Sequence, residues 1–259
     1  MFWTKQHVYL LIPTFIISII AAIIIAIALK NKDDKTKRIP LQVVTIVLLV
    51  LELWKQIRGF IVGYDNYWIP LHFCSLIIYT LPFAAFARGK YEDALMVLAG
   101  TVLSCIFLFM VIYPNIVFSD ESVRCWAKSI TFREGGNFSS FHSVTYHCIA
   151  VFAYILLVIQ GFCKFATKRD LKLIMIFMAV YCVFVGTLSQ VIKTNFNNFY
   201  HSNAPFLEDF RLKLIDSLGY GGQIIYVLMI AVGTMIVPLI AYLVLRGITK
   251  LTNKFILKK

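Results

Sequence analysis

Seven long apolar stretches, each about as long as a bilayer core is thick, dominate this sequence of 259 residues. A helix needs about 20 mostly apolar residues to cross the hydrocarbon layer. A soluble domain of this length could not bury them all, because 60% of the residues are hydrophobic and only 15% are charged. The sequence therefore predicts an all-α polytopic membrane helix bundle, a single domain over residues 1–259. The seven predicted transmembrane helices are Val8–Leu29, Ile39–Val62, Trp68–Ala87, Ala94–Tyr113, Phe141–Cys163, Leu171–Ile192 and Gln223–Leu245.

The net charge of +12 is distributed unevenly along the chain. Sixteen of the twenty-five Lys and Arg residues fall in segments that seven spans place on one side of the membrane, and seven fall on the other. Positively charged loops stay in the cytoplasm, so the N-terminus is predicted outside and the C-terminus in the cytoplasm. In a soluble protein this charge would suggest nucleic acid, but here it follows topology and no nucleic acid is expected.

The two longest predicted connections, Pro114–Ser140 and Lys193–Gly222, both fall on the outer side. Long loops over one face of a bundle often cover a functional site. Cysteine spacing gives no sign of a disulfide framework, since Cys125 alone lies in an outer loop. No spacing resembles a zinc or haem site, so neither a metal nor a cofactor is expected.

The second predicted span carries polar side chains that lipid makes costly. Glu52, Lys55 and Gln56 have the i, i+3, i+4 spacing that places them on one helix face. A charge at the bilayer centre costs roughly 2.5–3.5 kcal/mol, so such a group is a functional candidate. An equally weighted alternative is a structural Glu52–Lys55 ion pair, with Lys55 and Arg58 extending toward the interface.

The third predicted span begins with Pro70, which suits the first turn of a helix. Cys74 then lies about one turn from the positive helix end, where the pKa of a thiol can fall and favour a nucleophile. His72 is two residues earlier and would point about 200° away on a regular helix. The alternative is that Cys74 is a small apolar filler, as most membrane cysteines are.

Further polar residues lie near the outer ends of the fifth and sixth spans. His142 begins the fifth, where Ser143 and His147 are four residues apart and can face each other. The alternatives are a wetted interfacial histidine and an ordinary helix hydrogen bond. Asn195 and Asn198 follow the sixth span and can orient a lipid headgroup or a catalytic water, or belong to a simple polar loop.

The predicted depths of these groups agree. Glu52 lies thirteen residues beyond the inner end of its span, roughly 20 Å at 1.5 Å per residue. His72, Cys74, His142 and Asn195 come from the outer ends of three other spans. Four spans therefore predict one polar cavity in the outer half of the membrane, beneath the two long loops.

The same segments resemble those of a known family. Pro70-Leu71-His72-Phe73-Cys74-Ser75 resembles the P-L-H-x-C-S motif of the bacterial YwaF-type integral membrane proteins. Glu52, the segment Phe141–His147 and Thr194-Asn195-Phe196 are similar as well, although Lys193 replaces the glycine that usually precedes the last motif. YwaF-type proteins are similar to the eukaryotic transmembrane protein 164 family and, more distantly, to the androgen-induced membrane hydrolases of fatty acid esters.

The resemblance implies a bacterial plasma-membrane protein and a phospholipid acyltransferase site with a Cys/His pair, Cys74 as nucleophile and His142 as base or acid. We expect Glu52 to orient a histidine, His142 or His72. We expect a membrane phospholipid or other acyl lipid as the partner. The substrate would contact His72, Lys55, Gln56, Ser143, His147, Asn195 and Asn198. The alternative function is a transporter or solute-binding membrane subunit, in which the same cavity opens to the outside.

Overall fold

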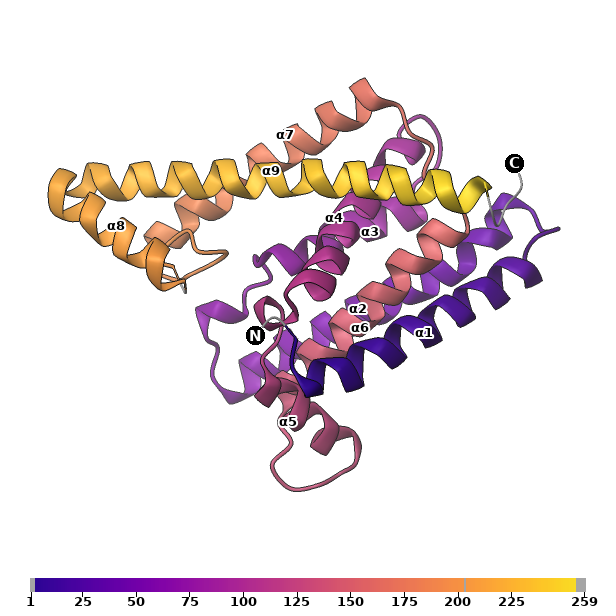
Figure 1. Cartoon of the computed structure of the whole chain (residues 1–259), viewed down its shortest axis with the longest axis horizontal. Coiled ribbons are helices and arrows are strands. Elements are labelled where there is room, and N and C mark those ends of the chain that lie inside the picture. Colours follow the sequence, from indigo (N-terminus) through magenta and orange to yellow (C-terminus); the bar gives the residue numbers. More distant parts are fainter. Residues whose placement is uncertain (1–2, 203, 255–259) are drawn as a thin grey trace. The chain divides into compact units, whose positions relative to one another are not determined.

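The computed structural model describes residues 3–202 and 204–254. Within these ranges the chain forms α-helices and short 3-10 helices, with no strand (Figure 1). The α-helices are α1 (Lys5–Ala28), α2 (Asp34–Val62), α3 (Leu76–Phe86), α4 (Glu92–Ile112), α5 (Asp120–Ile130), α6 (Phe138–Ile159), α7 (Thr167–Val191), α8 (Pro205–Leu218) and α9 (Tyr220–Thr252). The 3-10 helices are η1 (Asn66–Trp68), η2 (Phe73–Ser75) and η3 (Pro114–Ile116).

Six of these helices are long and apolar enough to cross a membrane. They are α1, α2, α4, α6, α7 and α9, and they correspond to six of the seven predicted spans. The all-α class and the integral membrane character predicted from the sequence are therefore confirmed.

The remaining predicted span, Trp68–Ala87, is helical only from Phe73 to Phe86. Ile69 has an extended ψ of 130°, the conformation that a following proline favours, and His72 is extended too, with ψ of 154°. The prediction that Pro70 lies in the first turn of this helix was therefore wrong. Cys74 instead lies in η2, the 3-10 turn that leads directly into α3.

The two longest predicted connections contain helices that the apolar pattern did not predict. Ser119 caps α5 by accepting the N–H of Ser122, and Asp120 stands in the first turn, where a carboxylate complements the helix dipole. The start of α1 is tied to this region, because His7 Nε2 lies 3.1 Å from the Phe118 carbonyl. In the second connection, Pro205 occupies the first turn of α8, where its missing N–H costs nothing.

The chain divides into two compact units, which are described separately. Unit 1 comprises residues 1–55, 77–165 and 241–259, and unit 2 comprises residues 56–76 and 166–240. In unit 1, α6 packs against α1, α4 and α5. Gly100 allows close approach in this core, since a β-carbon there would lie 3.0 Å from Leu245 Cδ2 and 3.2 Å from Cys163 Sγ.

Unit 2 contains η1, η2, α7, α8 and the first part of α9. The segment 192–202, which follows α7, turns sharply, and Asn197 and Asn198 adopt positive φ angles of 50° and 65°. Asparagine tolerates this left-handed conformation better than most residues. Phe196 and Phe199 of the same segment are completely buried, so they anchor it to the unit.

Candidate functional site

The predicted site residues divide between the two units. Unit 1 holds Glu52, Lys55, His142, Ser143 and His147. Unit 2 holds Gln56, His72, Cys74, Asn195 and Asn198. The common outer cavity and the Cys74–His142 pairing therefore stay predictions, and each group is described by itself.

In unit 1 a buried carboxylate lies between two cationic or potentially cationic groups. Glu52 is 6% exposed, and its Oε1 lies 2.7 Å from Lys55 Nζ. Its Oε2 lies 3.8 Å from Nε2 of His142, which is 8% exposed. The second distance exceeds that of a hydrogen bond but gives a strong Coulomb interaction when His142 is protonated. Glu52 thus serves as the ion-pair partner of Lys55 and also faces His142.

Aromatic rings surround this carboxylate cluster. The imidazole of His142 stacks on the Tyr146 ring at 5.7 Å between centroids and lies 6.1 Å from the Phe138 ring. Trp54 of α2 meets Phe138 edge to face at 5.0 Å. The rings come from α2 and α6, so they pack the two helices together beside the charged groups. Apolar walls lower the local dielectric and strengthen the interactions among those groups.

His147 lies on the same helix as His142 but makes a different contact. Its Nδ1 is 2.7 Å from the backbone oxygen of Ser143, one turn earlier. A carbonyl only accepts, so Nδ1 carries the proton and donates it. The partner of this nitrogen is therefore the main-chain oxygen of Ser143, at the i−4 position of the helix.

In unit 2 the segment that carries Cys74 is held by two side chains from α7 and the loop after it. Asn197 Oδ1 accepts the Phe73 N–H at 2.8 Å, and its amide nitrogen donates to the Tyr181 hydroxyl and, at 3.5 Å, to the Leu71 carbonyl. The Tyr181 hydroxyl in turn donates to the Leu71 carbonyl at 2.8 Å. We call Asn197 and Tyr181 the asparagine clamp, because together they fix the backbone on both sides of His72.

Cys74 follows the clamped Phe73 directly and has a half-buried thiol. His72 stands at the N-cap of the same turn, with Nε2 3.1 Å from the Tyr67 carbonyl and its ring 4.2 Å from the Tyr67 ring. Burial raises the pKa of the Tyr67 phenol, and electrostatic interaction with Cys74 and Asp65 adds to the shift. Cys74 thus shares its surroundings with a tyrosine that stays protonated and can donate.

The other predicted residues of unit 2 make contacts within the chain. Gln56 donates to the Trp68 carbonyl at 2.9 Å and accepts from the Tyr64 hydroxyl, so it holds η1 in place. Asn195 Oδ1 accepts the N–H groups of Tyr200 and His201, both at 3.4 Å. The Asn198 carbonyl accepts from the Tyr226 hydroxyl at 2.8 Å. Gln56 thus supports η1, and the two asparagines support the loop.

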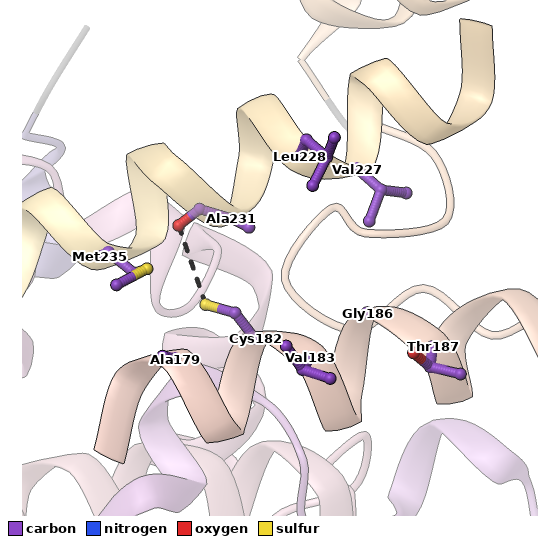
Figure 2. Close-up of a pocket in the computed structure, with 9 residues that line it drawn as sticks. All are labelled: Ala179, Cys182, Val183, Gly186, Thr187, Val227, Leu228, Ala231 and Met235. Carbon is purple, nitrogen blue, oxygen red and sulfur yellow. Dashed lines mark hydrogen bonds between the residues drawn. The ribbon is translucent and has the colours of Figure 1, made fainter. Parts of the chain in front are cut away.

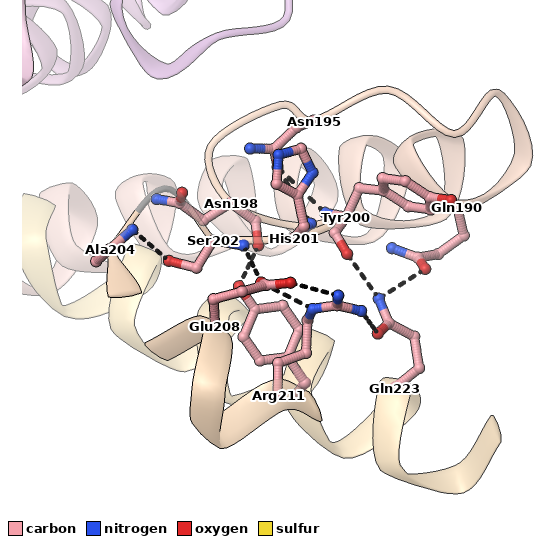
Figure 3. A network of polar contacts seen from close by, with 11 residues as sticks. Gln190, Asn195, Asn198, Tyr200, His201, Ser202, Ala204, Glu208, Arg211 and Gln223 are labelled. Atoms are coloured by element: carbon pink, nitrogen blue, oxygen red, sulfur yellow. Dashed lines mark hydrogen bonds and ion pairs between the residues drawn. The ribbon is translucent and has the colours of Figure 1, made fainter. Parts of the chain in front are cut away.

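A polar network fixes the far side of this loop (Figure 3). The Arg211 guanidinium donates two hydrogen bonds to the Glu208 carboxylate, from Nε to Oε2 at 2.9 Å and from Nη2 to Oε1 at 2.5 Å. It also donates to Gln223 Oε1 at 3.0 Å. Gln223 Nε2 donates to Gln190 and to the Tyr200 carbonyl, both at 3.0 Å, and Glu208 accepts the Ser202 N–H at 2.7 Å. We call Gln190, Ser202, Glu208, Arg211 and Gln223 the anchor network.

The electrostatics of the anchor network follow from its geometry. Hydrogen bonding to Arg211 holds the pKa of the Glu208 carboxyl below its ordinary value. The same contact raises the pKa of the Arg211 guanidinium. The loop that carries Asn197 is therefore secured from both sides, by the clamp toward η2 and by this network toward α8 and α9.

The sequence did not single out Asn197, Tyr181 or Arg211. A weak signal existed for Asn197, since an Asn-Phe-Asn-Asn run directly after a helix favours left-handed turns. Tyr181 is one aromatic residue in an apolar helix and gave no signal. Among the residues that the structure describes, no group of three or more His, Cys, Asp or Glu side chains is placed to hold a metal ion.

Comparison with known proteins identifies the family of the chain. Neither the curated proteins nor the solved structures contain a significant match. A family model described as TMEM164 family matches residues 2–245, which is nearly the whole chain. The resemblance to the transmembrane protein 164 family is thereby confirmed, while the narrower YwaF-type grouping stays a prediction. The chain belongs to the TMEM164 family.

Proposed function

We propose that this chain is a membrane-embedded enzyme that transfers or hydrolyses the acyl group of a lipid ester, with Cys74 as its nucleophile. The observation that carries the proposal is the asparagine clamp. Asn197 and Tyr181 bind the backbone of Leu71 and Phe73, immediately before a half-buried thiol in the first turn of a helix. The start of a helix can favour a thiolate, and the clamp fixes the backbone that carries the sulfur.

The reaction follows from the chemistry of a thiolate. The Cys74 sulfur attacks the ester carbonyl, a carbon–sulfur bond forms, and the lipid alkoxide leaves with a proton from an imidazolium. Water or a second lipid hydroxyl then attacks the thioester and returns the proton to the imidazole. Water as acceptor gives hydrolysis, and a lipid hydroxyl gives transfer.

We keep His142 as the proposed proton carrier. Its Nε2 lies 3.8 Å from Glu52 Oε2, so the carboxylate stands beside the nitrogen that would take up and return the proton. His72 lies in the same unit as Cys74, two residues before it, and is the second candidate for this role. Lys55, Ser143 and His147 stay proposed contacts of the lipid headgroup. Gln56, Asn195 and Asn198 also stay proposed contacts of the lipid, and their contacts within the chain support η1 and the loop.

The proposed topology has seven crossings, with α3 and the extended residues before it as the third. The N-terminus then lies outside and the C-terminus in the cytoplasm of a plasma-membrane protein, as the distribution of Lys and Arg favours. A single domain over residues 1–259 is likewise proposed. Reporter fusions that are active on one side of the membrane only, placed at each terminus, test the topology. Equal activity of one reporter at both termini would contradict it.

Mass spectrometry of the intact protein tests the nucleophile. The chain is purified in nanodiscs with a phosphatidylcholine that carries an alkyne-tagged acyl chain. We expect an acyl adduct that hydroxylamine removes and that Cys74→Ala abolishes. Cys125 is also half-buried but lies in α5, so Cys125→Ala is the matched control and should keep the adduct. Full acyl turnover by a correctly folded Cys74→Ala variant would exclude the mechanism.

The carboxylate cluster of unit 1 favours a transporter as the second candidate function. Glu52, Lys55 and His142 are titratable groups on helices that can cross a membrane, and such groups often carry protons or ions. A solute that protects Cys74 from a maleimide, with no acyl adduct from the tagged lipid, would favour transport.

A further inference from the structure

An apolar groove lies between α7 and α9 in unit 2 (Figure 2). Its volume is about 280 Å³, and its walls are residues between Ala179 and Thr187 on α7 and between Val227 and Met235 on α9. Apart from the Thr187 hydroxyl and the Cys182 thiol, the lining side chains are hydrocarbon or thioether. The thiol is directed at the Ala231 carbonyl, 3.8 Å away across the groove. The space therefore suits an apolar ligand.

The dimensions of the groove fit an alkyl chain. Each lining stretch covers nine residues, about 12 Å of helix at 1.5 Å per residue. An extended alkyl chain laid along the two helices would lie beside all of these residues, in a space of about 280 Å³.

One end of the groove adjoins the loop that carries the asparagine clamp. Gly186 lines the groove, and a β-carbon there would lie 3.4 Å from Phe199 Cδ1 and 3.4 Å from Val227 Cγ1. Phe199 is completely buried and stands two residues after Asn197, which binds the Phe73 N–H. Contacts within unit 2 therefore lead from the groove through Phe199 and Asn197 to the turn that contains Cys74.

We propose that this groove holds the acyl chain of a phospholipid ester, with the carbonyl end toward Phe199 and the terminal carbons toward Ala179 and Met235. The inference rests on the proposed function of Cys74, for which it supplies the substrate-binding site. Both helices are long and apolar enough to cross a membrane, so a lipid chain can enter sideways without leaving the bilayer. The groove ends at Ala179 and Met235, so its far end sets a preference for chain length.

Photolabelling tests the groove without any need for turnover. The probe is a phosphatidylcholine whose acyl chain carries a mid-chain diazirine and a terminal alkyne, mixed into phosphatidylglycerol liposomes. The protein is the full chain with Cys74→Ala. We expect label on the α7 and α9 lining residues, and a roughly tenfold loss of that label when Ala231→Phe fills the groove. Val232 is the next residue but 59% exposed, so Val232→Phe is the control that should keep the label.

Three results of this labelling experiment bear on the groove in opposite ways to the expected one. Label spread evenly over all lipid-facing helices, or an equal loss in Val232→Phe, would overturn the groove as a binding site. Preferential labelling by the tagged free fatty acid but not by the phospholipid would also overturn the proposal. Size-exclusion profiles matching the parent chain show that each variant is folded.

Chain-length selection separates this inference from the proposed function. Ala179→Phe closes the far end of the groove, so the adduct on Cys74 should shift toward shorter acyl chains by roughly tenfold in relative yield. Val180→Phe is the control, because Val180 is 65% exposed beside the groove. If Ala179→Phe leaves the chain-length preference of the adduct unchanged, the groove is not the acyl-chain site, while the proposed role of Cys74 as nucleophile is supported. Groove labelling with no adduct on Cys74 supports the groove and overturns the enzyme.

Discussion

The polar clusters of the two units use their side chains in opposite ways. In unit 1, the buried carboxylate of Glu52 forms an ion pair with Lys55 and faces His142. In unit 2, Asn197 and Tyr181 are neutral, and they hold backbone groups around His72. The first arrangement gathers titratable groups, and the second fixes geometry. An acyl-transfer site needs both properties, a proton carrier and a rigidly placed nucleophile.

The largest loss of stability is expected from substitution of Glu52. We expect Glu52→Ala to lower the free energy of unfolding by about 3 kcal/mol, because it leaves the Lys55 ammonium in apolar surroundings without its carboxylate. Lys55 is partly exposed, which keeps the effect at the lower end for a buried pair. Unfolding in increasing SDS measures it. The double variant Glu52→Ala/Lys55→Met removes both charges and should recover most of the stability. No recovery would show that the pair is not the source of the effect.

Asn197 should have the next largest effect. Asn197→Ala leaves the Phe73 N–H without its acceptor and puts alanine at a positive φ, which together cost about 2–3 kcal/mol. The rate of iodoacetamide alkylation at Cys74, relative to Cys125 in the same molecule, should change as η2 loosens. Asn197→Asp keeps the acceptor and should lie closer to the parent rate. An unchanged ratio of the two cysteines in Asn197→Ala would contradict a positioning role for the clamp.

A smaller effect is expected at Tyr181. Tyr181→Phe removes one hydroxyl that bonds both Asn197 and the Leu71 carbonyl, at a cost of about 1–1.5 kcal/mol. Thermal unfolding followed by intrinsic fluorescence measures it. Because both variants disturb one network, the double variant Tyr181→Phe/Asn197→Ala should lose less than the sum of the two single losses. Strict additivity would argue against a shared clamp.

The anchor network gives the smallest effect, and it depends on pH. The pKa of Glu208 is lower in the folded chain than its ordinary value of 4.5, so the unfolded chain takes up a proton first as the pH falls. The stabilisation is thus fully present above pH 4.5 and is lost as the pH drops through the folded pKa. Both partners are partly exposed, so we expect no more than about 1 kcal/mol. In Glu208→Gln this part of the pH dependence of thermal unfolding should disappear, and its persistence would assign the effect elsewhere.

Much of the fold was predictable because lipid enforces a simple pattern. Six predicted spans are helices of sufficient length and hydropathy, since a backbone that crosses a membrane must satisfy its own hydrogen bonds. The helices α5 and α8 lie outside that constraint, and their capping signals at Ser119 and Pro205 are too local to stand out. Around Pro70 the position in an apolar run suggested a helix, but extended backbone at Ile69 and His72 moved its start to Phe73.

The candidate site was predictable where it involves charge. Glu52 and Lys55 are conspicuous in an apolar helix, and the structure pairs them at 2.7 Å. Asn197 and Tyr181 act on backbone atoms more than a hundred residues away, and no spacing in the sequence encodes such contacts. For the same reason the sequence could not divide the predicted residues between two units.

The short helix from Phe73 to Phe86 has a consequence for the membrane itself. Its 14 residues rise only about 21 Å, against roughly 30 Å for the hydrocarbon core, so it is mismatched by about 9 Å. If the third crossing is α3 with the extended residues before it, as proposed, those residues lack the internal hydrogen bonds of a helix, so we expect the surrounding leaflet to thin or dimple there. Lipid headgroups and water would then descend toward Cys74. The ester bond of a phospholipid, normally held at the membrane surface, would reach the thiol by deformation of the bilayer rather than by extraction of the lipid.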